Sequence, residues 1–191
     1  MRNAHMPLWF FGFCLSAEAQ QRTVTLFDRL CEDWLFDAQP APITRRLHVT
    51  LFPLGSLADA PPGAVADACA AAGSVDGAPF EVSFDRAINR RGTQIALTAD
   101  RPCDALFAFQ QKLCAALRHV GMRAVRGWRF DPHVTLRYRE NILVDQPVPP
   151  VSWRVDEFVL IESLRGRTIH NQRRRWSLGG AGGNAALTAA A

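Results

Sequence analysis

The residues best suited to chemistry in this chain lie in two identical tetrapeptides. Residues 48–51 and 133–136 both have the sequence His-Val-Thr-Leu, and such a repeat indicates an internal duplication. Each copy combines an imidazole, which titrates near neutral pH, with a hydroxyl that can donate a hydrogen bond two residues later. One copy alone is most simply a core strand whose polar residues touch solvent, but the matched pair favours a functional site.

The pair suits the displacement of one oxygen by another at phosphorus. If His48 and His133 face one cleft, one imidazole can take a proton from the attacking oxygen while the other protonates the leaving oxygen. Thr50 and Thr135 can donate hydrogen bonds to the non-bridging phosphate oxygens, where charge builds. This chemistry requires no metal, and the five cysteines lack the C-x-x-C spacing of a zinc site. We therefore expect neither a metal nor a cofactor.

Strand geometry must place these side chains on a common face. Side chains alternate along a strand, so His48 and Thr50 point to one side while Val49 and Leu51 point to the other. The second tetrapeptide follows the same pattern. A pseudo-twofold relation between two lobes would then bring both His–Thr pairs to one cleft.

Three residues beside the motifs are candidates for substrate binding. By the same alternation, Arg46 shares a face with His48, and Arg137 shares one with His133. An arginine at either position suits contact with a phosphate, although an arginine that only solvates a strand end also fits the pattern. Phe52 follows the first threonine by two residues and either stacks on a base or belongs to the hydrophobic core.

The elements that must hold the motifs alternate along the chain. Hydrophobic spacing predicts long helices at residues 17–36 and 103–120, and an alanine-rich helix lies between Pro61 and Gly73. Strands are predicted at residues 8–15, 47–52, 80–87, 94–98, 134–138, 157–163 and 168–178. This mixture predicts an α+β fold with one domain over residues 1–178. The Gly- and Ala-rich residues 179–191 are predicted to form a disordered tail.

Composition excludes several classes of protein. With 191 residues, 48% hydrophobic and 21% charged, the chain fits a soluble globular domain and neither a disordered nor a fibrous protein. The apolar run at residues 7–15 is too short to span a membrane and precedes no small-residue cleavage site, so we expect a cytoplasmic protein. Net charge is +4, and Lys112 is the only lysine among 22 basic residues. This bias fits either phosphate binding or a GC-rich genome.

The motifs and their neighbours resemble a known family. Residues 46–55 (RLHVTLFPLG) and 130–136 (FDPHVTL) are similar to the two H-x-T motifs of the two-histidine (2H) phosphoesterases. The resemblance is greatest to their RNA 2′,3′-cyclic phosphodiesterase branch, also called 2′–5′ RNA ligase, and spans about residues 7–178. It implies a bilobal fold in which two antiparallel or mixed sheets flank a central cleft with helices outside. Arg137 departs from the sequence pattern of the family, because many relatives have Ala or Leu at this position.

The resemblance also implies an activity. Members open RNA 2′,3′-cyclic phosphates to 2′-phosphates, and some join or cleave 2′–5′ linkages. By resemblance, His133 activates water and His48 protonates the leaving 3′ oxygen, although the pseudo-symmetry permits the reverse. Expected partners are RNA ends or nucleoside cyclic phosphates, with no membrane, and the expected state is a monomer. Two alternatives stay open: an RNA-end-binding module without turnover, and a 2H enzyme for another cyclic phosphate or a 2′–5′ oligonucleotide.

Overall fold

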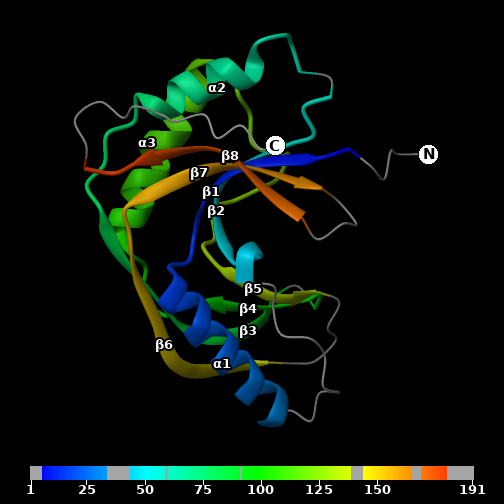
Figure 1. Ribbon diagram of the computed structural model, residues 1–191, viewed down its shortest axis with the longest axis vertical. Helices are drawn as coiled ribbons and strands as arrows, with labels where there is room; N and C mark the ends of the chain where they lie inside the picture. The colour runs from blue at the N-terminus through cyan, green and yellow to red at the C-terminus, as the bar shows by residue number, and fades with distance from the viewer. Residues whose placement is uncertain are drawn as a thin grey trace.

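Two four-stranded antiparallel sheets and three α-helices make up the part of the protein that the structure describes (Figure 1). This computed structural model describes residues 6–33, 44–58, 60–90, 92–138, 144–164 and 169–179. The helices are α1 (Ala17–Asp33), α2 (Ala64–Gly73) and α3 (Asp104–His119). The strands are β1 (Leu8–Cys14), β2 (His48–Gly55), β3 (Phe80–Arg90), β4 (Gln94–Thr98), β5 (Val134–Tyr138), β6 (Asp145–Val155), β7 (Glu157–Leu164) and β8 (Ile169–Ser177).

The strand order separates the two motifs into different sheets. The first sheet has the order β2-β1-β7-β8, and the second has the order β5-β4-β3-β6. All neighbouring strands are antiparallel. The motif strands β2 and β5 are therefore edge strands, and these two edges contact each other. The predicted α+β fold with two sheets is confirmed.

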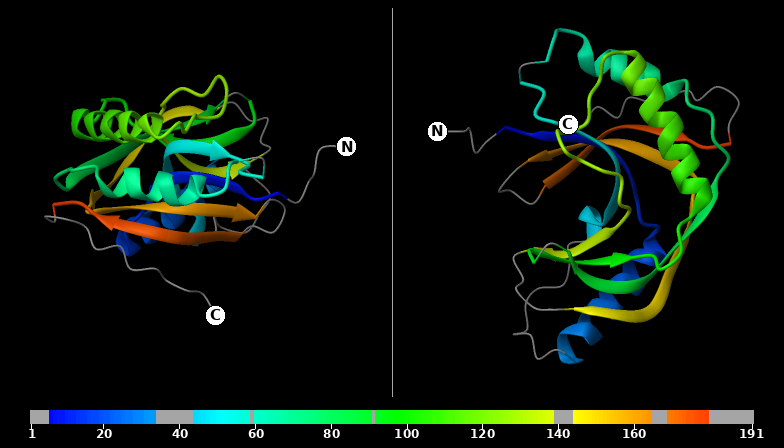
Figure 2. Two further views of the ribbon diagram at one scale, coloured as in Figure 1. Left: turned by 90° about the horizontal axis from the view of Figure 1, so that it is seen from above. Right: turned by 180° about the vertical axis from the view of Figure 1, so that it is seen from behind.

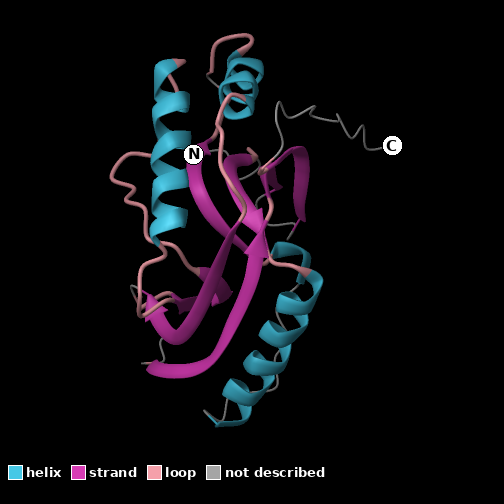
Figure 3. Ribbon diagram, turned by 90° about the vertical axis from the view of Figure 1, so that its left-hand side faces the viewer, coloured by secondary structure: helices cyan, strands magenta, loops and turns pink. Residues whose placement is uncertain are grey.

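Each long helix packs against the sheet to which its flanking strands do not belong. Helix α1 connects β1 and β2 of the first sheet but packs against β6 of the second, where Leu26 and Val151 are both buried. Helix α3 connects β4 and β5 of the second sheet and packs against β2 of the first, while it also contacts β3 of the second. Figure 3 shows α1 at one end of the molecule and the other two helices at the opposite end. This reciprocal packing fixes one sheet relative to the other.

Aromatic side chains from both sheets share one hydrophobic core. The ring of Phe13 on β1 lies 6.1 Å from the ring of Trp153 on β6 and 6.2 Å from that of Phe80 on β3. Asp156 is the single residue between β6 and β7, so the chain passes directly from the second sheet to the first (Figure 2). Packing of this kind is close to that of an organic crystal and holds the sheets in a fixed relation.

A β-bulge interrupts both motif strands at the same place. In β2 the extra residue is Leu51, because the residues on either side of it pair with consecutive residues of β1. In β5 it is Leu136, whose neighbours pair with consecutive residues of β4. The Leu51 carbonyl accepts a hydrogen bond of 3.2 Å from the buried Gln110 amide of α3. A bulge shifts the alternation of side chains, so residues beyond it do not keep the face of the motif.

One strand is not predicted by the sequence pattern. Strand β6 contains Pro147, Pro149 and Pro150, and prolines argue against a strand because they cannot donate to the ladder. The strand forms because it lies at the edge of its sheet, where unpaired positions are tolerated. The other predicted elements are confirmed, although β2 continues through Pro53 to Gly55.

Two predictions fall on residues that the structure does not describe. Helix α1 is described as far as Asp33, so residues 34–36 of the predicted helix lie outside the described part, as do residues 180–191 of the predicted tail. Within the described chain, no helix is both long enough and apolar enough to cross a bilayer.

Candidate active site

The same backbone hydrogen bond holds both motif histidines. Nδ1 of His48 donates to the carbonyl oxygen of Arg46 at 2.6 Å, and Nδ1 of His133 donates to that of Asp131 at 2.7 Å. Because a carbonyl oxygen only accepts, Nδ1 carries the proton in both rings. Nε2 is then the ring atom that can exchange a proton with a bound molecule. Two rings fixed in the same tautomer are well arranged for paired acid–base chemistry.

A pocket of about 50 Å³ joins the two motifs. Its lining consists of Arg46, Leu47, His48, Thr135, Leu136, Tyr138 and His170. Thr50 of the first motif and Thr135 of the second are both half-buried on their strands. His133 lies within electrostatic reach of the first motif, since positive charge on it lowers the pKa of His48. The structure therefore gathers parts of both motifs around one pocket.

Two further rings surround His48. The centroid of the Phe10 ring lies 4.7 Å from that of His48, and the centroid of the His170 ring lies 5.1 Å from it. The rings of Phe10 and His170 are 5.7 Å apart, so the three rings pack mutually. The sequence does not single out His170, whose buried Nδ1 has no hydrogen-bond partner among the described residues. Only the pairing of β8 with β7 brings it to the site.

The surroundings keep two imidazoles neutral. Burial lowers the pKa of His48 from 6.5 to about 4, although the hydrogen bond to the Arg46 carbonyl acts in the opposite direction. Positive charge on His170, His133 and Arg46 lowers the pKa of His48 further. Burial, followed by the Arg46 charge, lowers the pKa of His170 to about 4 as well. Both rings are therefore uncharged at pH 7 in the free protein.

These two histidines should make the stability of the protein depend on pH. The unfolded chain takes up a proton on each ring below pH 6.5, whereas the folded protein does so only near pH 4. Their contribution to the free energy of unfolding is thus complete above pH 6.5 and is lost as the pH falls toward 4. His170→Asn should reduce the slope of stability against pH in this window by roughly one proton. Urea denaturation at several pH values measures the slope.

His119, which is exposed at the end of α3, provides the matched control. His119→Asn should leave the slope between pH 6.5 and 4 as it is in the wild-type protein. A slope in His170→Asn equal to that of the wild type would contradict the neutral state assigned to the buried ring.

Arg46 lies at the pocket, but a helix rather than a strand places it there. It ends a short 3₁₀ helix (Thr44–Arg46) that is separated from β2 by Leu47, so the alternation used to predict its direction does not apply. Its Nε atom is buried and has no hydrogen-bond partner among the described residues. A cation beside neutral imidazoles, with an unsatisfied donor, is a suitable partner for an anion.

The residues that follow the two motifs, Phe52 and Arg137, differ in how deeply they are buried. Phe52 is completely buried in the core, so the interpretation that it stacks on a base is wrong. The bulge at Leu51 is the reason, because it turns the next side chain away from the face of the motif. Arg137 is half-buried on β5, whereas its neighbour Tyr138 is the residue that lines the pocket.

Two residues that the sequence does not single out surround His133. Arg90, the last residue of β3, donates a hydrogen bond from Nη1 to Nε2 of His133 at 3.0 Å. Its Nη2 forms an ion pair with the carboxylate of Asp131. Only 8% of the Arg90 side chain is exposed. The pairing of β3 with β4 and of β4 with β5 brings these groups together, and no local pattern signals it.

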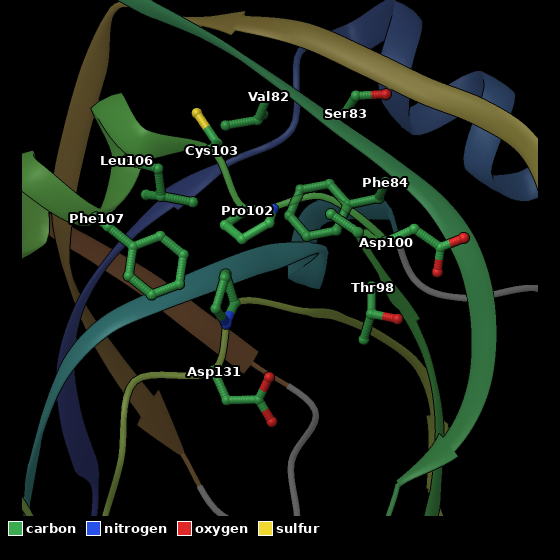
Figure 4. Close-up of a pocket in the computed structure, with 12 residues that line it drawn as sticks. Val82, Ser83, Phe84, Thr98, Asp100, Pro102, Cys103, Leu106, Phe107 and Asp131 are labelled. Carbon is green, nitrogen blue, oxygen red and sulfur yellow. The ribbon is translucent and has the colours of Figure 1, made fainter.

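A second pocket, of about 180 Å³, borders the segment that carries His133 (Figure 4). Its lining includes Leu106 and Phe107 from α3, and Cys103 directly before that helix. Figure 4 shows Asp131 at the opposite end of the pocket from Cys103, with its carboxylate directed away from Phe107. The carboxylate that pairs with Arg90 therefore belongs to the edge of this pocket rather than to its apolar walls.

Solved structures share the fold over nearly the whole chain. E. coli LigT complexed with 3′-AMP is 23% identical, with a TM-score of 0.72 over 92% of this chain and 99% of that chain. A phosphoesterase is 22% identical, with a TM-score of 0.73 over the same shares. The protein TT0787 of Thermus thermophilus is 22% identical, with a TM-score of 0.67 over 91% of this chain and 98% of that one. No curated protein matches the chain by sequence.

The family follows from a match over the middle of the sequence. The model of the 2′-5′ RNA ligase superfamily matches residues 36–167, which is more than half of the chain and includes both His-Val-Thr-Leu motifs. The match agrees with the resemblance stated from the motifs and with the fold of the solved structures. The chain therefore belongs to the 2′-5′ RNA ligase superfamily.

Proposed function

We propose that this protein is a metal-independent phosphodiesterase that opens the 2′,3′-cyclic phosphate at the end of an RNA to a 2′-phosphomonoester. The observation that carries the proposal is the matched pair of histidines, each with Nδ1 bonded to a backbone carbonyl, so that Nε2 is the nitrogen that can exchange a proton. Membership of a superfamily named for a 2′–5′ RNA ligase supports chemistry at a ribose phosphate.

In the proposed reaction, water attacks phosphorus in line with the 3′ oxygen. Neutral His133 takes a proton from the water through Nε2 as the new P–O bond forms. The bond between phosphorus and the 3′ oxygen breaks, and protonated His48 gives its Nε2 proton to that oxygen. The negative phosphate favours the protonated form of His48 once substrate is bound. The products are a 2′-phosphate and a 3′ hydroxyl, and the two histidines have exchanged protonation states.

The hydroxyls and cations of the site suit the phosphate in this reaction. Thr50 and Thr135 would donate hydrogen bonds to its two non-bridging oxygens, where negative charge increases in the transition state. Arg46, with a buried and unsatisfied Nε, would contribute the positive charge at the pocket. Arg137 remains a proposed substrate contact on the edge of β5.

Nucleotide chemistry and surface charge support an RNA substrate. E. coli LigT has been crystallised with 3′-AMP, NADP⁺, phosphate and ATP, so a protein of this fold accepts nucleotides. In the present protein, Arg118, Arg123, Arg126 and Trp128 line a groove of about 630 Å³ in the chain that leads to the second motif. Exposed arginines beside an aromatic ring are typical of surfaces that bind single-stranded nucleic acid.

Incubation with 2′,3′-cyclic nucleotides and with a cyclic-phosphate-ended oligonucleotide tests the function directly. Phosphorus NMR should show loss of the strained cyclic signal and appearance of a 2′-phosphomonoester. Tight binding without product would favour the RNA-end-binding module instead. The protein would instead be a 2H enzyme for another substrate if it turned over a different cyclic phosphate, or if it cleaved or joined a 2′–5′ linkage, and left the RNA end unchanged.

We expect turnover to survive chelation. Among the described residues, no three His, Cys, Asp or Glu side chains lie close enough together to hold a metal ion, and the proposed acid and base are both imidazoles. The rate in excess EDTA should therefore equal the rate in buffer, with a metal-dependent nuclease as the control that EDTA is effective. Complete loss of activity that a divalent ion restores would exclude the two-histidine mechanism.

A further inference from the structure

Two arginines on β3 differ in their surroundings. Arg86 has a side chain that is 32% exposed and pairs with Asp100 and Asp145, which are both at the surface. Arg90 has a side chain that is only 8% exposed and lies against the second motif. A charged side chain is rarely buried to this extent unless it is paired and its hydrogen bonds are satisfied. The burial of Arg90 therefore depends on the partners that it finds beside the second motif.

The hydrogen bonds of Arg90 define the state of His133. A guanidinium has only N–H donors, so the bond from Nη1 at 3.0 Å requires Nε2 of His133 to accept. Nδ1 of the same ring donates to the Asp131 carbonyl at 2.7 Å. Both nitrogens are thus engaged in opposite senses, and only the neutral ring with the proton on Nδ1 satisfies them. The carboxylate of Asp131 forms an ion pair with Nη2 of Arg90, so the same residue contacts both His133 and Arg90.

His48 has a different neighbourhood, although its backbone hydrogen bond is the same. Its ring packs on Phe10 and His170, with centroids 4.7 Å and 5.1 Å away. At His133 a cation donates to the nitrogen that exchanges the proton, whereas the ring of His48 packs on two other rings and lies near the Arg46 charge. The pseudo-twofold symmetry of the motifs is therefore broken at the atoms that matter for proton transfer.

We infer that Arg90 is a positioning residue that holds the His133 ring in the orientation and tautomer required for the base role proposed for it. The inference rests on the proposed function, because it assigns one of its two roles. The ring needs a lone pair on Nε2 to accept a proton from water, and the hydrogen bond from the guanidinium keeps Nε2 unprotonated and fixes its direction. The attacking water takes the place of the Arg90 Nη1 donor at Nε2, while Nη2 remains paired with Asp131.

Four variants test this role. Arg90→Gln removes the charge but keeps an N–H donor, Arg90→Lys keeps the charge but loses the planar fork, and Asp131→Asn removes the partner of Arg90. Arg86→Gln is the matched control, because it removes an ion-paired arginine from the same strand away from His133. Each purified variant is compared with the wild-type protein by ¹⁵N NMR of the histidine rings across pH, without substrate, and by the pH profile of kcat/KM.

Among the described residues, charged or titratable groups on three elements face His133. Arg90 faces it from β3, Asp131 from its own segment, and His48 from β2 within electrostatic reach. Removing the adjacent cation favours the protonated ring, so the acidic limb of kcat/KM should move to higher pH by about one unit in Arg90→Gln. At pH 7, kcat should fall by about 10- to 100-fold with little change in KM, as expected when a base is misplaced.

The wild-type ring should show the neutral tautomer with Nδ1 protonated at pH 7, and Arg90→Gln should show a mixture with protonated ring. Arg90→Lys should lie between the two, and Arg86→Gln should match the wild type. An Arg90→Gln protein with wild-type ring signals and an unshifted limb would overturn the role. If that variant does not fold, Arg90→Lys and Asp131→Asn test the role of Arg90 through the same NMR and kinetic measurements. If the wild-type protein shows the stated tautomer but no turnover, the proposed function is wrong, whereas the positioning of the His133 ring by Arg90 still holds.

Discussion

Replacing either motif histidine by alanine should lower kcat/KM for a 2′,3′-cyclic nucleotide by about 10²- to 10⁴-fold, the range for one positioned acid or base. Each substitution leaves one proton transfer without its group while the phosphate-binding residues remain. The double variant should be little worse than either single one, because His48 and His133 act in one transition state. Steady-state kinetics measures the rates, with exposed His119→Ala as the control. A near-wild-type rate in either single variant would remove that histidine from the chemistry.

The leaving group separates the two roles. A substrate with an activated leaving group does not need to be protonated as it departs, so it should restore the rate of His48→Ala. It should not restore the rate of His133→Ala, because the attacking water still needs a base. Restoration of His133→Ala instead would reverse the assignment and would also contradict the role inferred for Arg90.

Removing either motif hydroxyl should be the next largest effect. Thr50→Ala and Thr135→Ala should each lower kcat by roughly 10- to 1,000-fold, on the scale of one lost transition-state hydrogen bond. KM should change less, since the hydrogen bond strengthens as charge builds on the phosphate. Serine is the matched control, because Thr50→Ser and Thr135→Ser keep the hydroxyl and should retain most of the rate. An alanine variant with an unchanged kcat would show that its hydroxyl does not hold the phosphate.

The sequence predicts the fold well because its strongest signals are local. Alternation within a strand and helical spacing within α1 and α3 depend on neighbours in the chain, and both are confirmed. Strand β6 is not predicted, because its prolines are tolerated only at the edge of a sheet. Its edge position depends on the strand order and not on the local sequence.

The site is predicted less completely, for the same physical reason. The repeat identifies the four motif side chains, but the direction of Phe52 depends on a bulge that is visible only when β2 pairs with β1. Arg90 reaches His133 through two successive strand pairings, and His170 reaches His48 from the last strand of the first sheet. These residues carry no motif of their own. Their contacts exist only after the long-range pairings have formed.

The order of strands in the first sheet bears on how the protein matures on the ribosome. Strands β1 and β2 are synthesised first, but their sheet is completed by β7 and β8, which are synthesised last. The second sheet, β3 to β6, is continuous in the chain and can form while translation proceeds. Until β7 emerges, β1 has an unpaired edge open to incorrect partners. The half of the site around His133 is thus assembled early, and the half around His48 is completed only when the final strands leave the ribosome.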